Sequence, residues 1–496
     1  MDSIEKITTF CKQKGFIFQS SEIYGGLSGF WDYGPLGVEL FNNLKQHWWK
    51  TFIHSQENMV GLDASIISHP RVWKASGHLD SFGDLLLTCS KCRKKYRADH
   101  LIEEKLDLNV EGMEIEKINQ IIKENNLACP ECKSDFAELK DFNLLFKTNV
   151  GAEEGKASEA YLRGETAQGM FTDFKLIAES QRLKLPFGIG QIGKCFRNEI
   201  SPRDFIFRCR EFSIAEFEFF LHPNDEKCSL LTEKDLNLEF NFMDAETQEK
   251  NENVLNKSTI KELLSRNKLG EWHAYWLSRQ IRWTIDIGLS KENIKVREHT
   301  KDELSHYSSA TFDMDYSFPF GSKEIAGNAN RGQYDLTQHM KESGQKMQLF
   351  DEESKEKVIP RVIEPTFGMD RVFLATLVDA FTDDKRGNIV LKLEPSLAPI
   401  KCAILPLMNK ENLTEMAREV FTELNQHFNC TYDKSGSIGR RYARQDEIGT
   451  PFCITIDYDS LENGDVTIRD RDTTEQTRVK KEELAGVILK RLKKNI

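Results

Sequence analysis

Residues 194–212 read KCFRNEISPRDFIFRCREF, and no other segment says more about the fold. The turn-forming residues 201–204 separate two runs of strand-like composition. The segment therefore predicts a β-hairpin with strands at 194–200 and 205–212. Side chains alternate between the two faces of a strand, so each predicted strand presents one set of residues on a common face.

The predicted hairpin face carries Arg197 and Glu199 from the first strand and Arg208, Arg210 and Phe212 from the second. Arginine forks bind phosphate oxygens bidentately, and an aromatic ring can stack on a nucleobase. Such a face could hold a nucleotide without a glycine-rich loop. An exposed hairpin with surface salt bridges is the alternative, and the residues alone leave both interpretations open.

A glycine-rich segment precedes the hairpin. Residues 188–193 read GIGQIG and match the G-x-G-x-x-G pattern of dinucleotide-binding loops. That pattern requires a helix directly after it, whereas 194–200 predict a strand, so we interpret the match as a false positive. The chain contains no GxxxxGK[ST] sequence, which excludes a P-loop nucleotide site.

Four of the eleven cysteines form two close pairs, Cys89 with Cys92 and Cys129 with Cys132. Two CxxC turns complete a tetrahedral sulfur cage for zinc, and a closed four-cysteine site is structural rather than catalytic. Residues 101–126, between the pairs, are rich in Glu, Lys and Ile at helical spacing and predict a helical insert. Four unrelated core cysteines are the alternative, but the paired motif favours zinc.

Composition narrows the class of protein. The 496 residues suit about three or four globular units. No run of 18 or more apolar residues suggests a membrane span. The chain begins MDSIEK, which is acidic where a signal peptide would be basic, so we expect a cytoplasmic protein. A net charge of −11 argues against general coating of nucleic acid, so any RNA contact needs a local basic face.

The second half of the chain divides by composition. Residues 224–304 are polar and helix-forming and predict a helical insertion. An apolar helical run at 372–381 leads to a predicted loop at 382–388. From residue 400, strand-like and helical runs alternate, which predicts a separate α/β domain.

Three segments carry a family resemblance. FRNE at 196–199 with RCREF at 208–212 resembles motif 2 of class II aminoacyl-tRNA synthetases. Pro35, ahead of a predicted long helix through Trp48 and Trp49, resembles motif 1, and EPTFGMDR at 364–371 resembles motif 3. The chain is most similar to the homodimeric glycyl-tRNA synthetases, which it also matches at residues 75–78, 96–100, 142–148, 165–169, 334–339, 435–442 and 445–452.

This resemblance implies an α+β fold, with an antiparallel-sheet catalytic core, a zinc-ribbon-like insertion and a C-terminal α/β anticodon-binding domain. The implied divisions are 1–88 (core, motif 1), 89–140 (zinc module), 141–223 (core, motif 2), 224–304 (helical insertion), 305–395 (core, motif 3) and 396–496 (anticodon-binding domain). Motif 1 implies a homodimer, and no membrane partner is expected.

The resemblance also implies the reaction: activation of glycine with ATP and Mg²⁺, then transfer to the 3′ end of tRNA(Gly). Synthesis of diadenosine polyphosphate from the adenylate is an implied side activity. Positioning and charge stabilisation should supply most of the rate. The implied catalytic residues are Arg197, Glu199, Arg208 and Arg371.

The implied ligand sets are larger. For ATP the set is Arg197, Asn198, Glu199, Phe207, Arg208, Arg210, Phe212, Glu324, Ile325, Gly368 and Arg371, with Glu324 also linked to Mg²⁺. For glycine the set is Arg97, Glu165, Phe212, Glu216, Glu364, Thr366 and Gly368. For structural Zn²⁺ the set is Cys89, Cys92, Cys129 and Cys132.

The sequence departs from the family pattern at two positions of the implied glycine site. Gly164 stands where proline is typical, which loosens the loop that carries Glu165. Thr366 stands where serine is usual, and its added methyl group narrows the pocket.

Two rival interpretations remain. One is a class II synthetase for another amino acid, such as threonine, proline or histidine. The other is a non-catalytic, nucleic-acid-binding descendant, which would be expected to lose Arg197, Glu199 or Arg371. Separately, Arg440, Arg441 and Arg444 form a basic cluster that we expect either to contact tRNA or to be a solvated loop.

Overall fold

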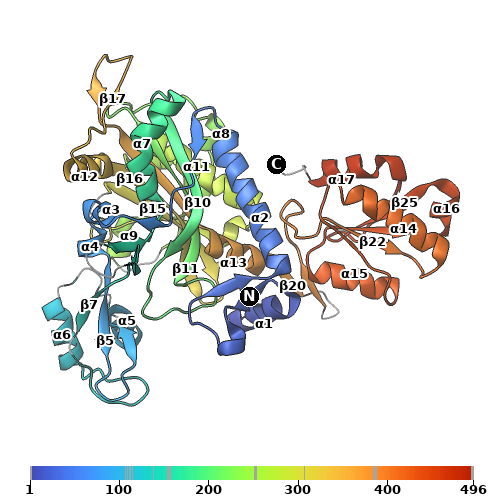
Figure 1. Cartoon of the computed structure of the whole chain (residues 1–496), viewed down its shortest axis with the longest axis horizontal. Coiled ribbons are helices and arrows are strands. Elements are labelled where there is room, and N and C mark those ends of the chain that lie inside the picture. The colour runs from blue at the N-terminus through green and yellow to red at the C-terminus, as the bar shows by residue number, and fades with distance from the viewer. Residues whose placement is uncertain are drawn as a thin grey trace.

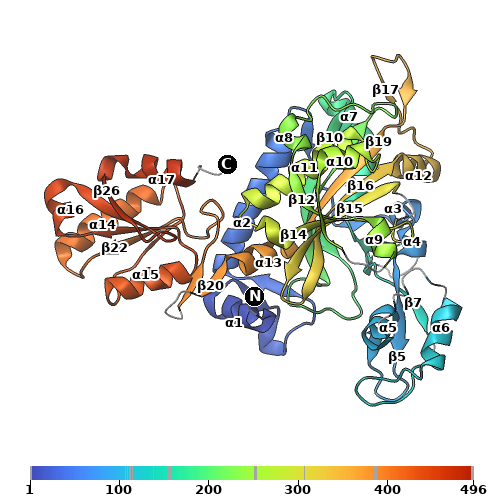
Figure 2. The same ribbon diagram turned by 180° about the vertical axis from the view of Figure 1, so that it is seen from behind.

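The structure is a computed structural model of the chain. It describes every residue except 1–2, 107, 109, 111–112, 114, 138, 153–157, 251–253, 306–307, 384–387 and 493–496. A large central unit carries a small cysteine-containing module on one side and a separate C-terminal domain at its other end (Figures 1 and 2). None of the described helices is both long and apolar enough to cross a membrane.

A nine-stranded sheet forms the central unit, in the order β13-β12-β14-β15-β16-β19-β11-β10-β3. All neighbours are antiparallel except the pairs β10–β3 and β12–β14. This confirms the predicted antiparallel core. The strands are β3 (Met59–Gly61), β10 (Phe187–Phe196), β11 (Glu211–Leu221), β12 (Glu239–Met243), β13 (Asn256–Thr259), β14 (Ile294–Glu298), β15 (Ala310–Phe318), β16 (Gly321–Gly332) and β19 (Arg361–Gly368).

The helical insertion predicted at 224–304 is only partly helical. Besides α8 (Glu233–Leu236), α9 (Ala245–Glu249), α10 (Ile260–Ser265) and α11 (Glu271–Asp286), it contains strands β12, β13 and β14. Phe240 and Phe242 of β12 are buried, whereas Asn256 and Lys257, half of β13, are exposed at the sheet edge. An edge strand can be polar because one side faces water, which is why composition concealed these strands.

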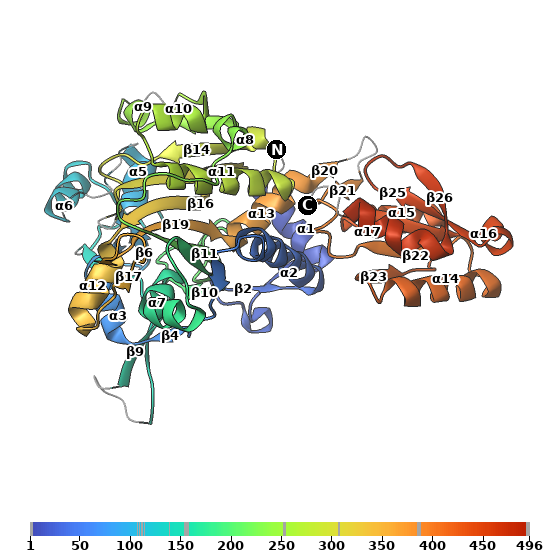
Figure 3. The same cartoon turned by 90° about the horizontal axis from the view of Figure 1, so that it is seen from above.

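Helices cover both faces of the sheet (Figure 3). On one face lie α2 (Pro35–Trp49), α11 and α13 (Met369–Ala380), packed around an aromatic-rich core. On the other lie α7 (Ala167–Gln181) and α12 (Tyr334–Ser343). Along β11, Phe217 and Phe219 pack into the first core and Phe220 into the second. Glu216 and Glu218, which alternate with the first two, therefore face the α7–α12 side.

The cysteine module contains a three-stranded sheet in the order β6-β5-β7 and two helices. These are β5 (Gly83–Thr88), β6 (Lys95–Arg97), β7 (Lys140–Asn143), α5 (Ala98–Leu106) and α6 (Ile115–Glu124). The two helices confirm the helical insert predicted between the cysteine pairs. A second small sheet, β4 (Ile67–Ser68), β9 (Glu159–Leu162) and β8 (Lys147–Asn149), leads from the module back to α7.

The C-terminal domain is the predicted α/β unit. Its sheet has the order β23-β22-β24-β25-β26, with β22 (Cys402–Pro406), β23 (Cys430–Tyr432), β24 (Phe452–Ile456), β25 (Asp465–Asp470) and β26 (Gln476–Lys480). Its helices are α14 (Glu411–Leu424), α15 (Ile438–Glu447), α16 (Tyr458–Asn463) and α17 (Leu484–Leu492).

The chain enters this domain through β20 (Phe381–Asp383) and β21 (Ile389–Leu391), where the sequence predicts a loop at 382–388. Residues 384–387 of that loop lie outside the described residues. The connection that follows is tied to both domains. Asn43 of α2 donates to the carbonyls of Leu397 and Ala398, both at 3.1 Å, and Arg471 donates to the carbonyl of Leu393 at 2.7 Å.

Candidate active site

The segment between β10 and β11 is a long loop rather than a tight hairpin. Strand β10 ends at Phe196 and β11 begins at Glu211, so the predicted strand bounds and shared faces are wrong. Asp204 and Phe205 have positive φ angles of 59° and 58°, which ordinary strand geometry forbids. The glycine-rich residues 188–193 lie inside β10, which confirms that they form no phosphate loop.

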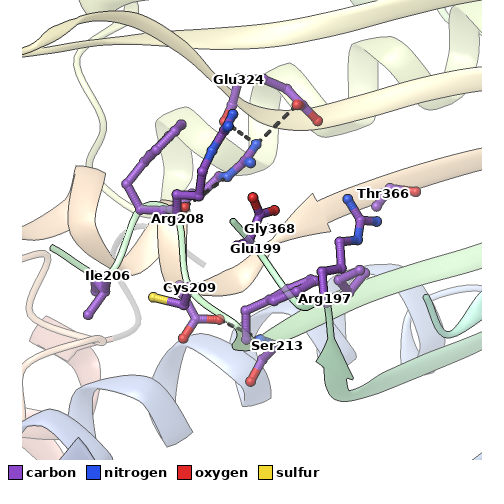
Figure 4. A pocket seen from close by; sticks show the side chains of 14 residues that line it. Arg197, Glu199, Ile206, Arg208, Cys209, Ser213, Glu324, Thr366 and Gly368 are labelled. Atoms are coloured by element: carbon purple, nitrogen blue, oxygen red, sulfur yellow. Dashed lines mark hydrogen bonds and ion pairs between the residues drawn. The ribbon is translucent and has the colours of Figure 1, made fainter. Parts of the chain in front are cut away.

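This loop, with β11, β16 and β19, encloses an open pocket (Figure 4). Its lining residues are Arg197, Glu199, Ile206, Phe207, Arg208, Cys209, Phe212, Ser213, Ile214, Glu324, Thr366, Gly368, Asp370 and Arg371. Most of the residues implied for ATP are thus brought together from distant parts of the chain.

Arg197 is fixed from three directions. Its Nε donates to the carbonyl of Gly164 at 3.1 Å. Its guanidinium lies 5.1 Å from the ring centroid of Phe82 and 5.3 Å from that of Phe212. Aromatic faces attract and orient a guanidinium, so its charge is held ready for an anion in the pocket.

Two further arginines complete the cationic lining. Arg371 donates to both the carboxylate and the carbonyl oxygen of Glu324 at 3.0 Å, and its guanidinium lies 4.5 Å from the ring centroid of Phe207. Arg208 contacts Nε2 of His100 at 3.3 Å. Burial, with Arg97 nearby, lowers the pKa of His100 to about 4, so the imidazole is neutral and accepts this hydrogen bond.

Besides the three glutamates implied for glycine, four of the implied residues lie outside the pocket lining. Arg210 donates to the carbonyls of Glu199 at 3.0 Å and Ser28 at 2.9 Å, which anchors the loop. Ile325 is fully buried in the core. Asn198 is held through its backbone by the carbonyl of Leu144, and Arg97 forms ion pairs with Asp84 at 2.9 Å and with Asp99.

The three glutamates implied for glycine are buried near one another on the α7–α12 side of the sheet. Glu216 accepts hydrogen bonds from the backbone N–H of Thr166 at 2.8 Å and from the hydroxyl groups of Thr166 and Thr366, the latter at 3.1 Å. Thr366 also lines the open pocket, so it connects the pocket to the glutamates.

Glu165 lies among further polar side chains. His78 approaches it at 3.3 Å, and Gln168 donates to it at 2.9 Å. Although burial acts to raise the pKa of Glu165, His78 and Arg331 hold it below its ordinary value. For Glu364, burial prevails over the nearby Arg331, and with Glu216 close by the pKa rises to about 8. Burial and Glu165 also raise the pKa of Glu216.

Arg331 joins this buried cluster, although the sequence analysis does not single it out. Its side chain is 1% exposed, and it donates to both oxygens of Asp335 and to Glu364, each at 2.8 Å. Asp335 belongs to a segment that carries the resemblance, but Arg331 precedes it on the end of β16. The only available signal was a charged residue in an otherwise small, uncharged run at 325–332.

The four paired cysteines gather at the tip of the cysteine module. Their sulfur atoms all lie within 4.8 Å of one another, with Cys89 3.3 Å from Cys132 and Cys92 3.7 Å from Cys129. A tetrahedron with Zn–S bonds of about 2.3 Å has edges of about 3.8 Å, so this cluster fits zinc.

The basic cluster of the C-terminal domain separates into different roles. Arg441 is 1% exposed and donates to the carbonyls of Pro406, Leu407 and Asp433, so its predicted tRNA or solvent exposure is wrong. Arg444 pairs with the carboxylate of Asp433. Arg440 remains exposed on α15.

Comparison with known proteins finds close relatives over the whole chain. Residues 401–491 match a family described as an anticodon binding domain. Glycine–tRNA ligases from Geobacillus thermodenitrificans and Caldanaerobacter subterraneus subsp. tengcongensis are each 45% identical over 500 residues, which is 99% of this chain and 98% and 99% of theirs. The Geobacillus kaustophilus glycine–tRNA ligase is 46% identical over 487 residues, which is 96% of each chain.

Proposed function

The chain belongs to the glycine–tRNA ligase family, and from that premise we propose that the pocket beside the 197–210 loop binds ATP while the buried glutamates behind it bind glycine. The enzyme joins glycine to tRNA at the expense of ATP. One observation carries the site assignment. Thr366 lines a pocket with three arginines and also hydrogen-bonds Glu216, so the two sites are adjacent.

The arginines supply charge stabilisation in the first step, where the glycine carboxylate attacks the α-phosphorus of ATP and pyrophosphate leaves. Arg197 holds the α-phosphate, since its guanidinium is clamped beside Phe212. Arg208 and Arg371 hold the outer phosphates. These groups are fixed before the reaction, so little reorganisation is needed as charge develops.

Three residues position the base and the metal. Phe212 stacks on adenine and Glu199 accepts from its amino group. Glu324 holds Mg²⁺, which when bound neutralises phosphate charge. Its carboxylate is half exposed and already lies in the pocket lining, which suits that task. Arg371 and Glu324 pair with each other in the structure. When the ligands bind, Arg371 faces the negative phosphate and Glu324 faces the positive Mg²⁺.

Glycine offers only an ammonium group, a carboxylate and two hydrogens. Glu165, Glu216 and Glu364 bind the ammonium group. Arg97 is the residue assigned to the carboxylate, and binding it would require Arg97 to loosen its ion pairs with Asp84 and Asp99. A single methyl group is worth only about 1–3 kcal/mol in attraction, so alanine must be rejected by steric exclusion. The methyl group of Thr366 contributes to that exclusion.

The same family assignment extends to the rest of the molecule. Cys89, Cys92, Cys129 and Cys132 hold a structural zinc ion that fixes the cysteine module. The divisions at residues 88, 140 and 395 separate functional units, whereas residues 224–304 extend the sheet of the catalytic unit. Helix α2 forms the interface of a homodimer. None of the eleven cysteines forms a disulfide, which suits the reducing cytoplasm. Diadenosine polyphosphate synthesis is a side reaction of the adenylate.

Exchange of labelled pyrophosphate into ATP, scanned across all the amino acids, tests the assignment. We expect exchange with glycine alone, and loss of it in Arg197→Ala. Arg71→Gln, which removes an exposed arginine paired with Glu342, is the matched control and should exchange normally. Exchange with another amino acid would overturn the glycine site, and normal exchange by Arg197→Ala would overturn the ATP site.

A further inference from the structure

Glu218 lies in the glycine site but has no role in the scheme above. It is 0% exposed, and both of its carboxyl oxygens lack a hydrogen-bond partner among the described residues. It lies two residues beyond Glu216 on β11 and so faces the same α7–α12 side. A buried carboxylate without partners is very costly, so a buried carboxyl group of this kind is stable only when it is protonated.

Glu364 is the cross-strand neighbour of Glu218. The register of β11 and β19 pairs Glu216 with Thr366 and Phe219 with Ile363, which puts Glu218 opposite Glu364. Directly opposed residues in a sheet have Cβ atoms about 4.5–5.5 Å apart. Two carboxyl groups at that range cannot both ionise easily in a buried site.

The surrounding charges do not neutralise the pair. The acidic groups that face it are Glu216 on β11, Glu165 before α7, and Asp335 on α12. The cationic group is Arg331 on β16. Two imidazoles lie nearby: His78 on α4 (His78–Ser81) beside Glu165, and His339 on α12 beside Gln168. Strand β10 places the uncharged Ile189 and Gln191 beside Glu218 and Glu216, and α7 contributes Gln168. Arg331 binds Asp335 twice and Glu364 once and lies 4.0 Å from Glu165, so this one guanidinium is shared among several carboxyl groups.

We propose that Glu218 and Glu364 hold one proton between them, and that the ammonium group of glycine displaces this proton to solvent when it binds. The proposal rests on the glycine site proposed above. The O–H bond of one carboxylic acid breaks, its electron pair stays on the carboxylate, and water or buffer accepts the proton. The incoming ammonium charge replaces the charge of the proton, so the total charge of the site is unchanged.

The titration behaviour of the pair supports this exchange. Burial, with Glu364 nearby, raises the pKa of Glu218 well above its ordinary value, and the pKa of Glu364 is about 8. The pair is therefore protonated near neutral pH, and its two carboxyl groups titrate as a unit. Because binding releases a proton, glycine should bind up to about tenfold more tightly for each unit of rising pH, until the pair ionises by itself.

Glu218 is thus a positioning residue. Without substrate, the proton that it shares with Glu364 lowers the negative charge of the buried site. When glycine binds and the proton leaves, Glu364 is fully ionised and faces the ammonium group. Other carboxylates of the site already have partners: Thr166 and Thr366 for Glu216, and Gln168 and His78 for Glu165.

Calorimetric titration of the full-length protein with glycine, in buffers of different ionisation enthalpy near neutral pH, counts the protons released. We expect between about half a proton and one proton per glycine, because the pair is mostly protonated at that pH. Glu218→Gln should still bind glycine but release almost none, since Glu364 then ionises beside Arg331. Glu179→Gln, at an exposed site on α7, should match the wild type.

Each outcome has a distinct meaning. Glycine binding without proton release by the wild-type protein overturns the proposal, even if Glu218→Gln fails to fold. Undiminished release by folded Glu218→Gln also overturns it, because Glu218 then holds no part of the proton. Failure of glycine to bind, with binding of another amino acid, overturns the glycine site itself instead.

Discussion

Replacing Arg331 with glutamine should destabilise the central unit severely. The native guanidinium is 1% exposed and makes three charged hydrogen bonds of 2.8 Å to Asp335 and Glu364. Glutamine can satisfy at most one of these groups, so two buried carboxyl groups lose their counter-charge.

The size of the effect follows from burial. Breaking a buried ion pair by removing one partner costs about 3–5 kcal/mol, whereas an exposed pair contributes about 0–1 kcal/mol. Arg71, whose side chain is 56% exposed in its pair with Glu342, therefore provides the matched control. We expect a loss of about 3–5 kcal/mol for Arg331→Gln and less than about 1 kcal/mol for Arg71→Gln.

Urea unfolding followed by tryptophan fluorescence measures this difference, because all seven tryptophans lie in the central unit, outside the cysteine module and the C-terminal domain. The pH dependence gives a second check. The stranded carboxyl groups of Arg331→Gln acquire raised pKa values, so the folded variant binds more protons than the unfolded chain. The difference in free energy of unfolding between the wild type and Arg331→Gln should therefore shrink as the pH falls from about 8 to about 6.

A loss below about 1 kcal/mol for Arg331→Gln would refute the reasoning, because it would mean that the buried carboxyl groups need no counter-charge. If the stability loss of Arg331→Gln grew as the pH fell, buried carboxylates without a counter-charge could not be its cause. Arg331→Lys separates charge from geometry, because one ammonium group cannot reproduce the fork that binds Asp335.

Three other predictions concern separate parts of the molecule. His100→Ala should raise the KM for ATP severalfold with little change in the KM for glycine, because a hydrogen bond of about 1 kcal/mol no longer orients Arg208; pyrophosphate exchange measures both. The purified protein should contain about one zinc ion per chain by elemental analysis, and Cys92→Ser should lose it and the compactness of the module by limited proteolysis. Arg441→Ala should lower the melting temperature of the C-terminal domain, whereas Arg440→Ala should weaken only tRNA binding; equal effects on stability would contradict the difference in burial.

Motif chemistry and long periodic elements could be predicted from the sequence. Helix α2 begins at Pro35 as expected, because proline suits the first turn of a helix, and the two helices between the cysteine pairs follow a clear helical pattern. The pocket residues around Arg197 were also predicted, because the resemblance named them one by one.

Long-range burial could not be predicted. Arg441 lies on an amphipathic helix whose composition is typical of a solvated face, yet its guanidinium reaches carbonyl groups 34 and 35 residues earlier in the chain. Likewise, Arg210 shares the loop of Arg197 and Arg208 but is committed to the carbonyl of Ser28, 182 residues away. Spacing along the chain does not reveal whether an arginine meets a ligand or a backbone carbonyl.

The tied connection between the two domains has a consequence for the choice of RNA. Asn43 of the central unit binds the connection at the carbonyls of Leu397 and Ala398. Arg471 of the C-terminal domain binds it at the carbonyl of Leu393. The anticodon-binding surface and the chemical site are therefore kept at a set separation. We therefore expect a tRNA whose anticodon arm is shortened or lengthened to be charged with glycine less efficiently than a tRNA of native length.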